Sequence, residues 1–542
     1  MVCCLSCVES NSQLGGSLIP IEQTYKIFTQ DIPIKDVGIS MADSLSGYSQ
    51  KRITIGAVED EDFGLSTRSS AITLIPMFSD KIDFGKNPQF QSFHFSIKKD
   101  TLSVIDESQT SILQNIYVYE LEEAPLATKI FDINASIKHG TNRVTKGTPV
   151  YAGGDSLSFN FTREFGEKFF SMTEEDTKDL ETYLAKFPGI YIETDRPRGG
   201  SGRINMFNLQ LSYDSDYYYI NGNEATLKFR SEYDGTVKDT SLIFYLGATD
   251  FFDLDSLLTK GTQGKLPQYC LNLSGHKTRE KVGKATEYIP VEGGGGLKPV
   301  ISAKYLKHLA EEAISKAGGI PSQAVINKAS LVFPFEFPED YKEMEHWPDY
   351  LSPTCRIKGE DATTFMGLTD ASSKDENQGD IDRSNFKYAP DITYHMQELL
   401  KIDESKPDDT KTKRLNNGDY DIWFLIMANE ITVNENKSNS EMSDYYNYLA
   451  YQSYYNSMYG GYGGYGYGGY GGYGGYGGYG SAYSNYYTYA MLAQYASSNS
   501  SSTSTTVELD KDRYYNAWLN GPEHETNAPR LELTFAIPNT TE

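Results

Sequence analysis

The sequence predicts a mainly β protein with two β-sandwich- or jelly-roll-like regions and a few short inserted helices. Short alternating runs rich in Tyr, Thr, Ile and Phe are typical of half-buried strands, and turn residues separate them. Many short strands at regular spacing favour sandwich architectures. The chain has 542 residues, which exceeds the size at which a single core keeps growing. Two or more domains are therefore expected.

The chain begins Met-Val-Cys-Cys-Leu-Ser-Cys, and Leu5-Ser6-Cys7 is similar to the end of a bacterial lipobox. In that motif the cysteine after a small residue is lipidated and becomes residue one. The basic and apolar parts of a signal peptide are missing here, and a chance cluster of cysteines is the alternative. Polar, turn-rich sequence follows, so residues 1–30 are predicted to be a tether, lipidated at Cys7, that anchors a soluble body to a membrane surface.

Residues 31–170 are predicted to form the first sandwich-like domain, with alternating runs at 51–55, 71–75, 93–97 and 115–119. A short helix follows. Thr173 is its expected N-cap with acidic residues in the first turn, and Pro188 and Gly189 end it. Strands are expected at 190–194, 204–213, 217–220, 225–229 and 241–246.

The centre of the chain joins a short strand to four glycines, Gly293 to Gly296, and then to an amphipathic helix over residues 300–317. Gly318 and Gly319 are expected to stop this helix, and a strand restarts at 329–337. Residues 171–440 are predicted to form the central and C-terminal β-rich domain. Its polar segment 358–385 is expected to be a loop, and 419–432 a strand.

Residues 441–504 form a Tyr/Gly-rich low-complexity loop whose centre, 459–480, is a GGY repeat. Such sequence offers little aliphatic surface for a core and has much backbone entropy to lose. It is either a tolerated insertion in a hairpin or a dedicated adhesive loop. Residues 505–542 are expected to supply the closing strands of the C-terminal domain.

The net charge of −25 argues against nucleic acid as a partner, because a phosphate backbone requires clustered Lys and Arg. No apolar run is long enough to span a bilayer. Cys270 and Cys355 are the two cysteines in the body of the chain; they could pair in an oxidising compartment or remain buried free thiols. No CxxC pair with further ligands indicates zinc, and no cofactor is predicted.

Catalytic motifs are not recognisable, so we expect a non-enzyme. The seven histidines are scattered without an HExxH pattern, and the serine in residues 199–203 does not fit a nucleophile elbow. The acidic runs at 59–62 and 214–216 could bind calcium, but they lack the EF-hand spacing, and a solvated turn is the simpler interpretation. A hydrolase would need acidic residues that converge in a cleft.

Four short Asp-Ser/Thr-apolar sequences resemble O-glycosylation sites of exported Bacteroidota proteins. Their acceptor residues are Ser44, Thr101, Ser156 and Ser256. The motif is loose, and chance accounts for some matches. Modification at any of them would favour export, since it belongs to exposed loops outside the cytoplasm.

Several pieces in order along the chain resemble a Bacteroidota family of outer-membrane lipoproteins known as domain of unknown function 4270. They are residues 55–56 with 62–64, 187–192, 296–299, 326–329, 519–521 and 529–533. The GGY tract is not part of that pattern. The resemblance implies an exported, lipid-anchored, β-rich protein, and it supplies no catalytic residues.

The expected function is therefore that of a non-catalytic, lipid-anchored outer-membrane lipoprotein that faces the cell exterior. Its expected role is that of an accessory or scaffold subunit of an outer-membrane protein assembly, with an outer-membrane barrel and other lipoproteins as partners and the barrel-assembly machinery as the leading example. The alternative is a glycan-binding surface lipoprotein with jelly-roll domains, because sandwich folds often bind sugars on aromatic platforms and the chain has 42 Tyr.

Overall fold

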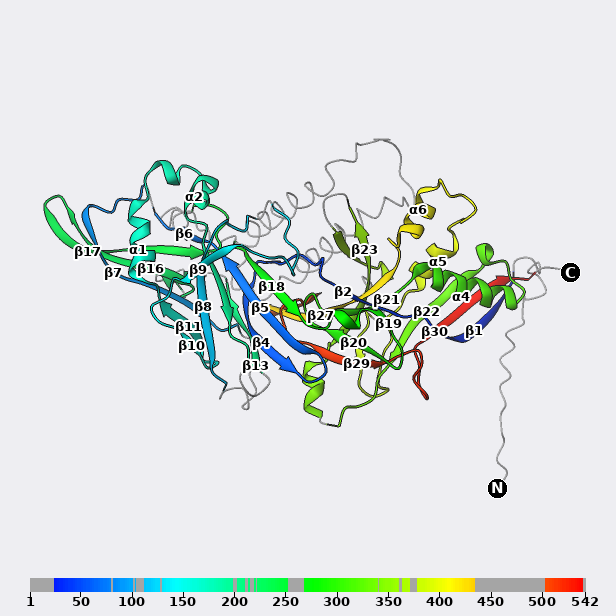
Figure 1. The fold of residues 1–542 in the computed structure, drawn as a ribbon. Helices are drawn as coiled ribbons and strands as arrows, with labels where there is room; N and C mark the ends of the chain where they lie inside the picture. The colour runs from blue at the N-terminus through cyan, green and yellow to red at the C-terminus, as the bar shows by residue number, and fades with distance from the viewer. Residues whose placement is uncertain are drawn as a thin grey trace, which may run out of the picture.

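A computed structural model describes residues 24–78, 81–100, 103, 112–126, 129–197, 202–209, 213–214, 219–220, 222–251, 268–339, 341–359, 363–370, 378–433 and 503–539 (Figure 1). Antiparallel strands dominate this part of the chain, and its helices are few and short, so the predicted mainly β class is confirmed. The strands form two lobes. The N-lobe comprises residues 46–276, and the C-lobe comprises 24–41 together with 283–539. The N-lobe is thus inserted into the C-lobe.

The N-lobe is built from two large sheets, seen at the left of Figure 1. The first contains β3 (Tyr48–Ser49), β4 (Arg52–Asp60), β5 (Gly64–Ile72), β8 (Gln114–Leu121), β9 (His139–Arg143), β10 (Val150–Tyr151), β12 (Ile190–Thr194), β13 (Gly202–Asn208) and β18 (Cys270–His276). The second contains β6 (Leu74–Pro76), β7 (Lys86–Lys98), β11 (Ser156–Asn160), β16 (Glu224–Tyr233) and β17 (Thr236–Leu246). A separate two-stranded pair is β14 (Tyr213–Asp214) with β15 (Tyr219–Ile220).

An aromatic core fills the space between these two sheets. The ring of Phe93 on β7 lies 4.6 Å from that of Phe161 and 5.2 Å from that of Phe244. The N-lobe helices α1 (Arg163–Lys168) and α2 (Leu180–Lys186), with the short turns η4 (Phe169–Ser171) and η5 (Glu175–Thr177), close one side of the core. Thr173 bonds Asp176 in the turn before the predicted helix, but the helix itself starts at Leu180, because Asp179 accepts from the Thr182 amide at 2.7 Å.

Strands on both sides of residue 170 share these sheets and this core. β12 lies between β5 and β8, β13 pairs with β4, and β16 pairs with β7. The expected division between residues 170 and 200 therefore runs through the N-lobe core. The chain passes between the two lobes near residues 42–47 and 277–282 instead. The reason is that hydrogen bonds within each sheet join strands that are distant in sequence.

The C-lobe also contains two sheets. One runs β1 (Tyr25–Pro33), β30 (Arg530–Pro538), β22 (Val325–Pro334), β26 (Lys387–Tyr388) and β25 (Ile381–Asp382). The other runs β19 (Gly283–Lys284), β2 (Gly38–Met41), β21 (Leu297–Ile301), β27 (Ile422–Val433), β23 (Tyr350–Lys358) and β24 (Thr363–Gly367), and β28 (Thr503–Leu509) also pairs with β27. β20 (Tyr288–Glu292) and β29 (Asn516–Asn520) form a two-stranded ribbon.

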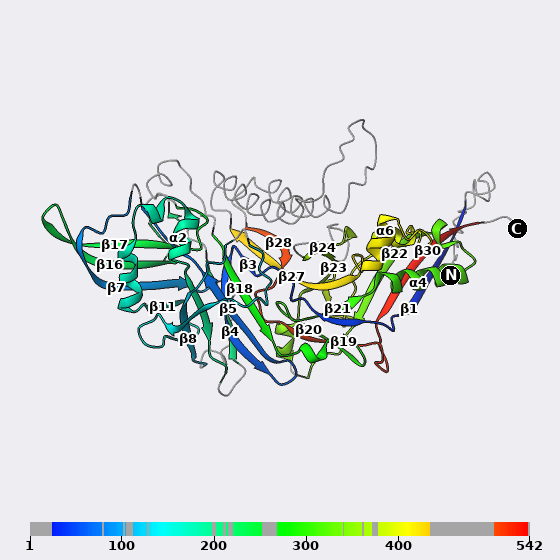
Figure 2. The same ribbon diagram turned by 45° about the horizontal axis from the view of Figure 1, so that its top comes forward.

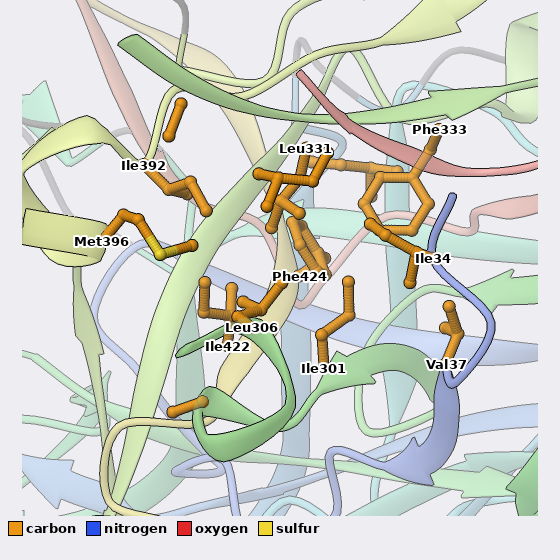
Figure 3. Close-up of a cluster of buried hydrophobic side chains, with 14 of the residues drawn as sticks. Ile34, Val37, Ile301, Leu306, Leu331, Phe333, Ile392, Met396, Ile422 and Phe424 are labelled. Atoms are coloured by element: carbon orange, nitrogen blue, oxygen red, sulfur yellow. The ribbon is translucent and has the colours of Figure 1, made fainter. Parts of the chain in front are cut away.

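The C-lobe helices are α4 (Ala303–Lys316), α5 (Thr393–Leu400) and α6 (Thr410–Asn417), with the short turns η6 (Arg279–Lys281), η7 (Pro321–Gln323) and η8 (Tyr341–His346). Figure 3 shows Leu306 of α4 and Met396 of α5 directed into a core that also contains Phe333 and Phe424. The predicted central helix is confirmed, although Val300 belongs to β21. Gly318 ends it in the left-handed conformation, with φ of 84°.

Two further expectations concern the GGY tract and the polar segment 358–385. The GGY tract lies outside the described residues, between the paired ends of β27 and β28. The segment 358–385, expected to be a loop, contains β24 and β25 in its described part. β24 pairs with β23 and buries two adjacent apolar residues, Phe365 and Met366, in a segment whose average composition is polar.

Candidate functional site at the lobe junction

The four glycines at the centre of the sequence form a loop between β20 and β21, where distant segments of the chain approach its backbone. A Cβ atom at Gly293 would lie 2.7 Å from the Arg513 carbonyl oxygen, and one at Gly295 would lie 2.7 Å from Cγ2 of Ile133. One at Gly294, where φ is 55°, would lie 2.7 Å from Nη2 of Arg68. Glycine is required because the N-lobe and the C-terminal segment both pack against this loop. We call this region the lobe junction.

A hydrogen-bonded relay crosses the lobe junction from β18 to β20. Nε2 of His276 lies 2.7 Å from Oγ of Ser274, and Nδ1 of His276 lies 3.3 Å from Oε1 of Glu292. Thr278 also donates its hydroxyl to Glu292, and the Leu297 amide donates to Glu292 at 3.1 Å. Glu292 is the shared acceptor and ties the N-lobe strand β18 to the start of the glycine loop.

Burial and hydrogen bonding set the charge states of this relay. Burial lowers the pKa of His276, which favours the neutral imidazole. Burial alone would raise the pKa of Glu292, but the bonds from His276, Thr278 and the Leu297 amide outweigh it and hold that pKa below its ordinary value. A neutral histidine therefore faces an ionised carboxylate, and the proton belongs on Nδ1, between the two.

The hydrogen bonds run from Ser274 to His276 and on to Glu292, which is the arrangement of a nucleophilic catalytic triad. The side chains of His276 and Glu292 are both only 2% exposed, and Ser274 is buried on the regular strand β18. The Ser274 hydroxyl also accepts from Nη1 of Arg68 at 2.7 Å, and a Cβ at Gly294 would lie 2.8 Å from it. In this arrangement the glycine loop covers the serine, so the relay connects the two lobes and presents no group to a substrate.

Lys298, two residues after the glycine loop, is completely buried beneath it. Its ammonium donates to the carbonyl oxygens of Glu292, Gly294 and Gly296, the latter two at 3.1 and 3.3 Å. Burial lowers the pKa of Lys298 to about 7. The lysine thus satisfies the carbonyl groups that the tight loop turns inward.

A second charged cluster joins β4 of the N-lobe to β27 of the C-lobe. Arg52 donates to both carboxylate oxygens of Glu430, at 2.7 and 2.9 Å, and lies 3.3 Å from Asp100 and 3.7 Å from Asp512. Burial disfavours its charge, but these three carboxylates outweigh burial and raise the pKa of Arg52. Lys511 next to Asp512 donates to the carbonyl oxygens of Ser46 and Tyr48. The guanidinium is the centre of a buried bidentate ion pair between the lobes.

An aromatic contact completes the lobe junction at the β4–β5 turn. The ring of Phe63 lies 4.9 Å from that of Trp518, and the Lys281 ammonium lies over both rings. Asp60, in the run first considered as a calcium site, accepts instead from the amides of Asp62 and Phe63 and from the Asn516 side chain. The described part of the chain contains no cluster of three or more His, Cys, Asp or Glu residues that could hold a metal ion.

The structure places two of the sequence-predicted site residues beside the lobe junction. The Cys270 thiol lies 3.2 Å from the Arg52 carbonyl oxygen, and Ser44 belongs to the crossing at residues 42–47. Cys7, Thr101 and Ser256 lie outside the described residues. Ser156 is exposed at the start of β11, which suits a modified residue. Ser44 is a poor acceptor in the folded chain, because its hydroxyl oxygen is buried without a hydrogen-bond partner in the described structure.

Cys270 and Cys355 are both free and buried, and they belong to different cores, so the considered disulfide is not formed. The physical reason is position: Cys270 is on β18 of the N-lobe, and Cys355 is on β23 of the C-lobe. Burial raises the pKa of both thiols far above the ordinary value, which makes them unreactive.

Sequence reasoning missed the charged residues of the lobe junction. Arg52 and Lys298 are embedded in short apolar runs that form buried strands, and Arg68 stands among serines and a threonine on the buried strand β5. One signal could have identified them: a charged residue in a strand that is expected to be buried. A buried charge requires an oppositely charged or hydrogen-bonding partner.

Comparison with models of known families, with curated proteins and with solved structures gave no match. The resemblance to a lipoprotein family therefore remains a hypothesis. In the described part of the chain, no helix is both long and apolar enough to cross a bilayer.

Proposed function

We propose that this chain is a non-catalytic, lipid-anchored outer-membrane lipoprotein that acts as an accessory or scaffold subunit of an outer-membrane protein assembly. The partners would be an outer-membrane barrel and other lipoproteins, and the barrel-assembly machinery is the leading example of such an assembly. The Leu5-Ser6-Cys7 sequence and the family resemblance support the anchor and the location.

The lobe junction is the observation that carries the scaffold role. Arg52, Arg68, His276, Glu292 and Lys298 are all at least largely buried between the lobes and bonded to groups of this chain. Charged side chains that line a reaction site would face a cleft. Here they fix the mutual position of two β-rich bodies, which is the property that a subunit needs to hold partners at a set distance.

The glycan-binding alternative draws on aromatic side chains that are partly exposed. Tyr288 is 40% exposed and packs edge-on against Trp518 at 6.3 Å, with Lys281 beside the latter ring. Tyr119 and Tyr191 pack against His139 on the outward face of the first N-lobe sheet, with ring centroids 4.7 and 4.6 Å from that of the histidine. Several other described tyrosines fill the cores, among them Tyr151, Tyr183, Tyr245 and Tyr388. A core lined by tyrosine does not form the extended sugar platform that this alternative requires.

The test is affinity purification from detergent-solubilised outer membrane of the native host, with a tag after Glu542. We expect stoichiometric recovery of an outer-membrane barrel and further lipoproteins. Recovery of the protein alone, at near-monomer size, would refute the scaffold role, and glycan arrays would then test the alternative.

A Cys7→Ser variant is the matched control, because it removes the acceptor sulfur and leaves the described body unchanged. We expect the variant to leave the membrane fraction and to lose its partners. If it stays in the membrane and keeps the same partners, the anchor is not at Cys7.

A further inference from the structure

The end of the C-lobe that lies away from the N-lobe carries a group of exposed apolar side chains. Tyr25 and Ile27 on β1 are 53% and 67% exposed, and Ile320 and Val325 are 53% and 44% exposed. The strand register places Ile27 opposite Ala536, and Ala536 opposite Val325, so these side chains share one face of the sheet. Ile320 follows Gly319, whose Cβ position lies 2.5 Å from Ile537 of β30. Ile537 faces the C-lobe core, so Ile320 approaches this end of the sheet from the opposite face. We call these four residues the terminal patch.

The same sheet face becomes more polar with distance from its free end. Next to the terminal patch, the hydroxyl oxygens of Thr29 and Thr534 lie 3.1 Å apart. Two residues further along, Asp31 is opposite Glu532, and Arg530 bonds Glu532 at 2.7 Å. Apolar, hydroxyl and charged side chains therefore follow one another along the strands, as they do when an element enters a membrane interface end-on.

The first and last described residues also lie at this part of the molecule. β1 begins at Tyr25, and Asn539, which follows β30, bonds Thr24. Figures 1 and 2 show the outer ends of β1 and β30 far from the β16–β17 hairpin of the N-lobe. An extended chain covers at most about 3.3–3.6 Å per residue, so the residues from Cys7 to Thr24 could reach on the order of 60 Å. A tether of that length permits many orientations, and the surface of the body must select among them.

Among the described residues, other exposed apolar side chains occur as smaller groups, such as Leu113 with Val150 in the N-lobe. Phe337 and Phe386 pack on each other with ring centroids 5.9 Å apart. Val237 is 61% exposed near the tip of the β16–β17 hairpin, among exposed polar neighbours. Val237 therefore offers a matched position at the opposite end of the molecule.

We propose that the terminal patch rests in the interfacial zone of a phospholipid bilayer and orients the anchored protein with the β16–β17 hairpin pointing away from the membrane. Tyr25 would occupy the headgroup level, and Ile27, Ile320 and Val325 would enter the boundary of the acyl chains. The charged row of Asp31, Arg530 and Glu532 would remain in water. This inference rests on the proposed lipid anchor at Cys7.

The test is nitroxide labelling of the full-length lipidated protein in vesicles of phosphatidylethanolamine and phosphatidylglycerol. Labels are placed through Ile27→Cys or Val325→Cys, with Val237→Cys as the control. Cys270 and Cys355 are buried and should not react, which labelling of the parent protein verifies. The measured quantity is the label's accessibility to oxygen divided by its accessibility to a water-soluble nickel complex. On vesicle binding, we expect this ratio to rise several-fold at residues 27 and 325 and to stay unchanged at residue 237.

The outcomes separate this inference from the proposed function. Vesicle-bound protein in which residues 27 and 325 remain as water-exposed as residue 237 would overturn the orientation and leave the anchor intact. Mass spectrometry that finds no lipid on Cys7, with protein that does not float with vesicles, would overturn the proposed function and this inference with it.

Discussion

The cores of the two lobes and the lobe junction are held together by different interactions. Inside the N-lobe, Phe93 and its neighbours are joined by non-directional apolar contact. Between the lobes, Arg52 and Glu430 meet in a buried bidentate ion pair, and His276 meets Glu292. Apolar contact holds many similar arrangements equally well, whereas a buried charge is satisfied in few of them. The difference suggests that each lobe is stabilised by its core. Their mutual position is then specified by the charges together with the apolar contacts that also cross the lobe junction, such as Phe63 with Trp518.

The largest expected effect comes from removing one partner of the central ion pair. Glu430→Ala leaves the Arg52 guanidinium with fewer buried partners, and breaking a buried pair in this way costs about 3–5 kcal/mol. The free energy of unfolding from denaturant titration measures the loss. A cost below about 1 kcal/mol would show that the lobe junction is not specified by this pair.

The double variant Arg52→Met with Glu430→Leu sharpens the comparison. Replacing a buried ion pair by apolar residues of similar volume is often neutral or stabilising, so we expect much of the stability to return. We also expect the lobes to lose their fixed arrangement, which small-angle scattering would detect as a broader distance distribution. A stable double variant with an unchanged distribution would show that apolar packing alone sets the lobe positions.

The next effect tests the close approach of the glycine loop. Gly294→Ala places a Cβ at φ of 55° and 2.7 Å from Nη2 of Arg68. The left-handed conformation alone costs roughly 1–2 kcal/mol for a residue with a Cβ, and displacement of Arg68 adds to it. Gly147→Ala is the control, because φ is 76° there and no atom lies within 4 Å of the Cβ position. Equal losses of unfolding free energy in both variants would exclude a role for the contact with Arg68.

The same contrast explains what the sequence could predict. The alternation at 190–194 and the apolar spacing of the central helix gave β12 and α4, because each element buries its own apolar side chains. The four glycines were visible, but their partners were not. Arg68, His276 and Arg513 approach that loop from distant segments, and no local pattern encodes such contacts. The position of the lobe boundary was missed for the same reason, since β12, β13 and β16 pair with strands from before residue 170.

A pH titration of stability tests whether burial makes the Lys298 ammonium lose its proton near neutral pH. Its pKa is about 7 in the folded protein against an ordinary 10.5. Between these pH values, Lys298 binds a proton in the unfolded chain but not in the folded chain. The free energy of unfolding therefore rises with pH by up to about 1.4 kcal/mol per pH unit. Below pH 7, Lys298 is protonated in both states and its contribution to the free energy of unfolding is constant. Burial also lowers the pKa of Lys511, so Lys298→Met should reduce this slope without abolishing it. An unchanged slope would mean that Lys298 titrates normally.

The smallest effect is expected from an ion pair outside the lobe junction. Arg230 and Asp239 face each other across β16 and β17 with two bonds, at 2.8 and 3.1 Å, yet both side chains are more than half exposed. Solvent and salt screen such a pair, and its formation immobilises two long side chains. Asp239→Asn should therefore leave the unfolding midpoint unchanged within error, although its bidentate geometry matches that of Arg52 with Glu430. A loss comparable to that of Glu430→Ala would show that geometry, and not burial between the lobes, gives the central pair its effect.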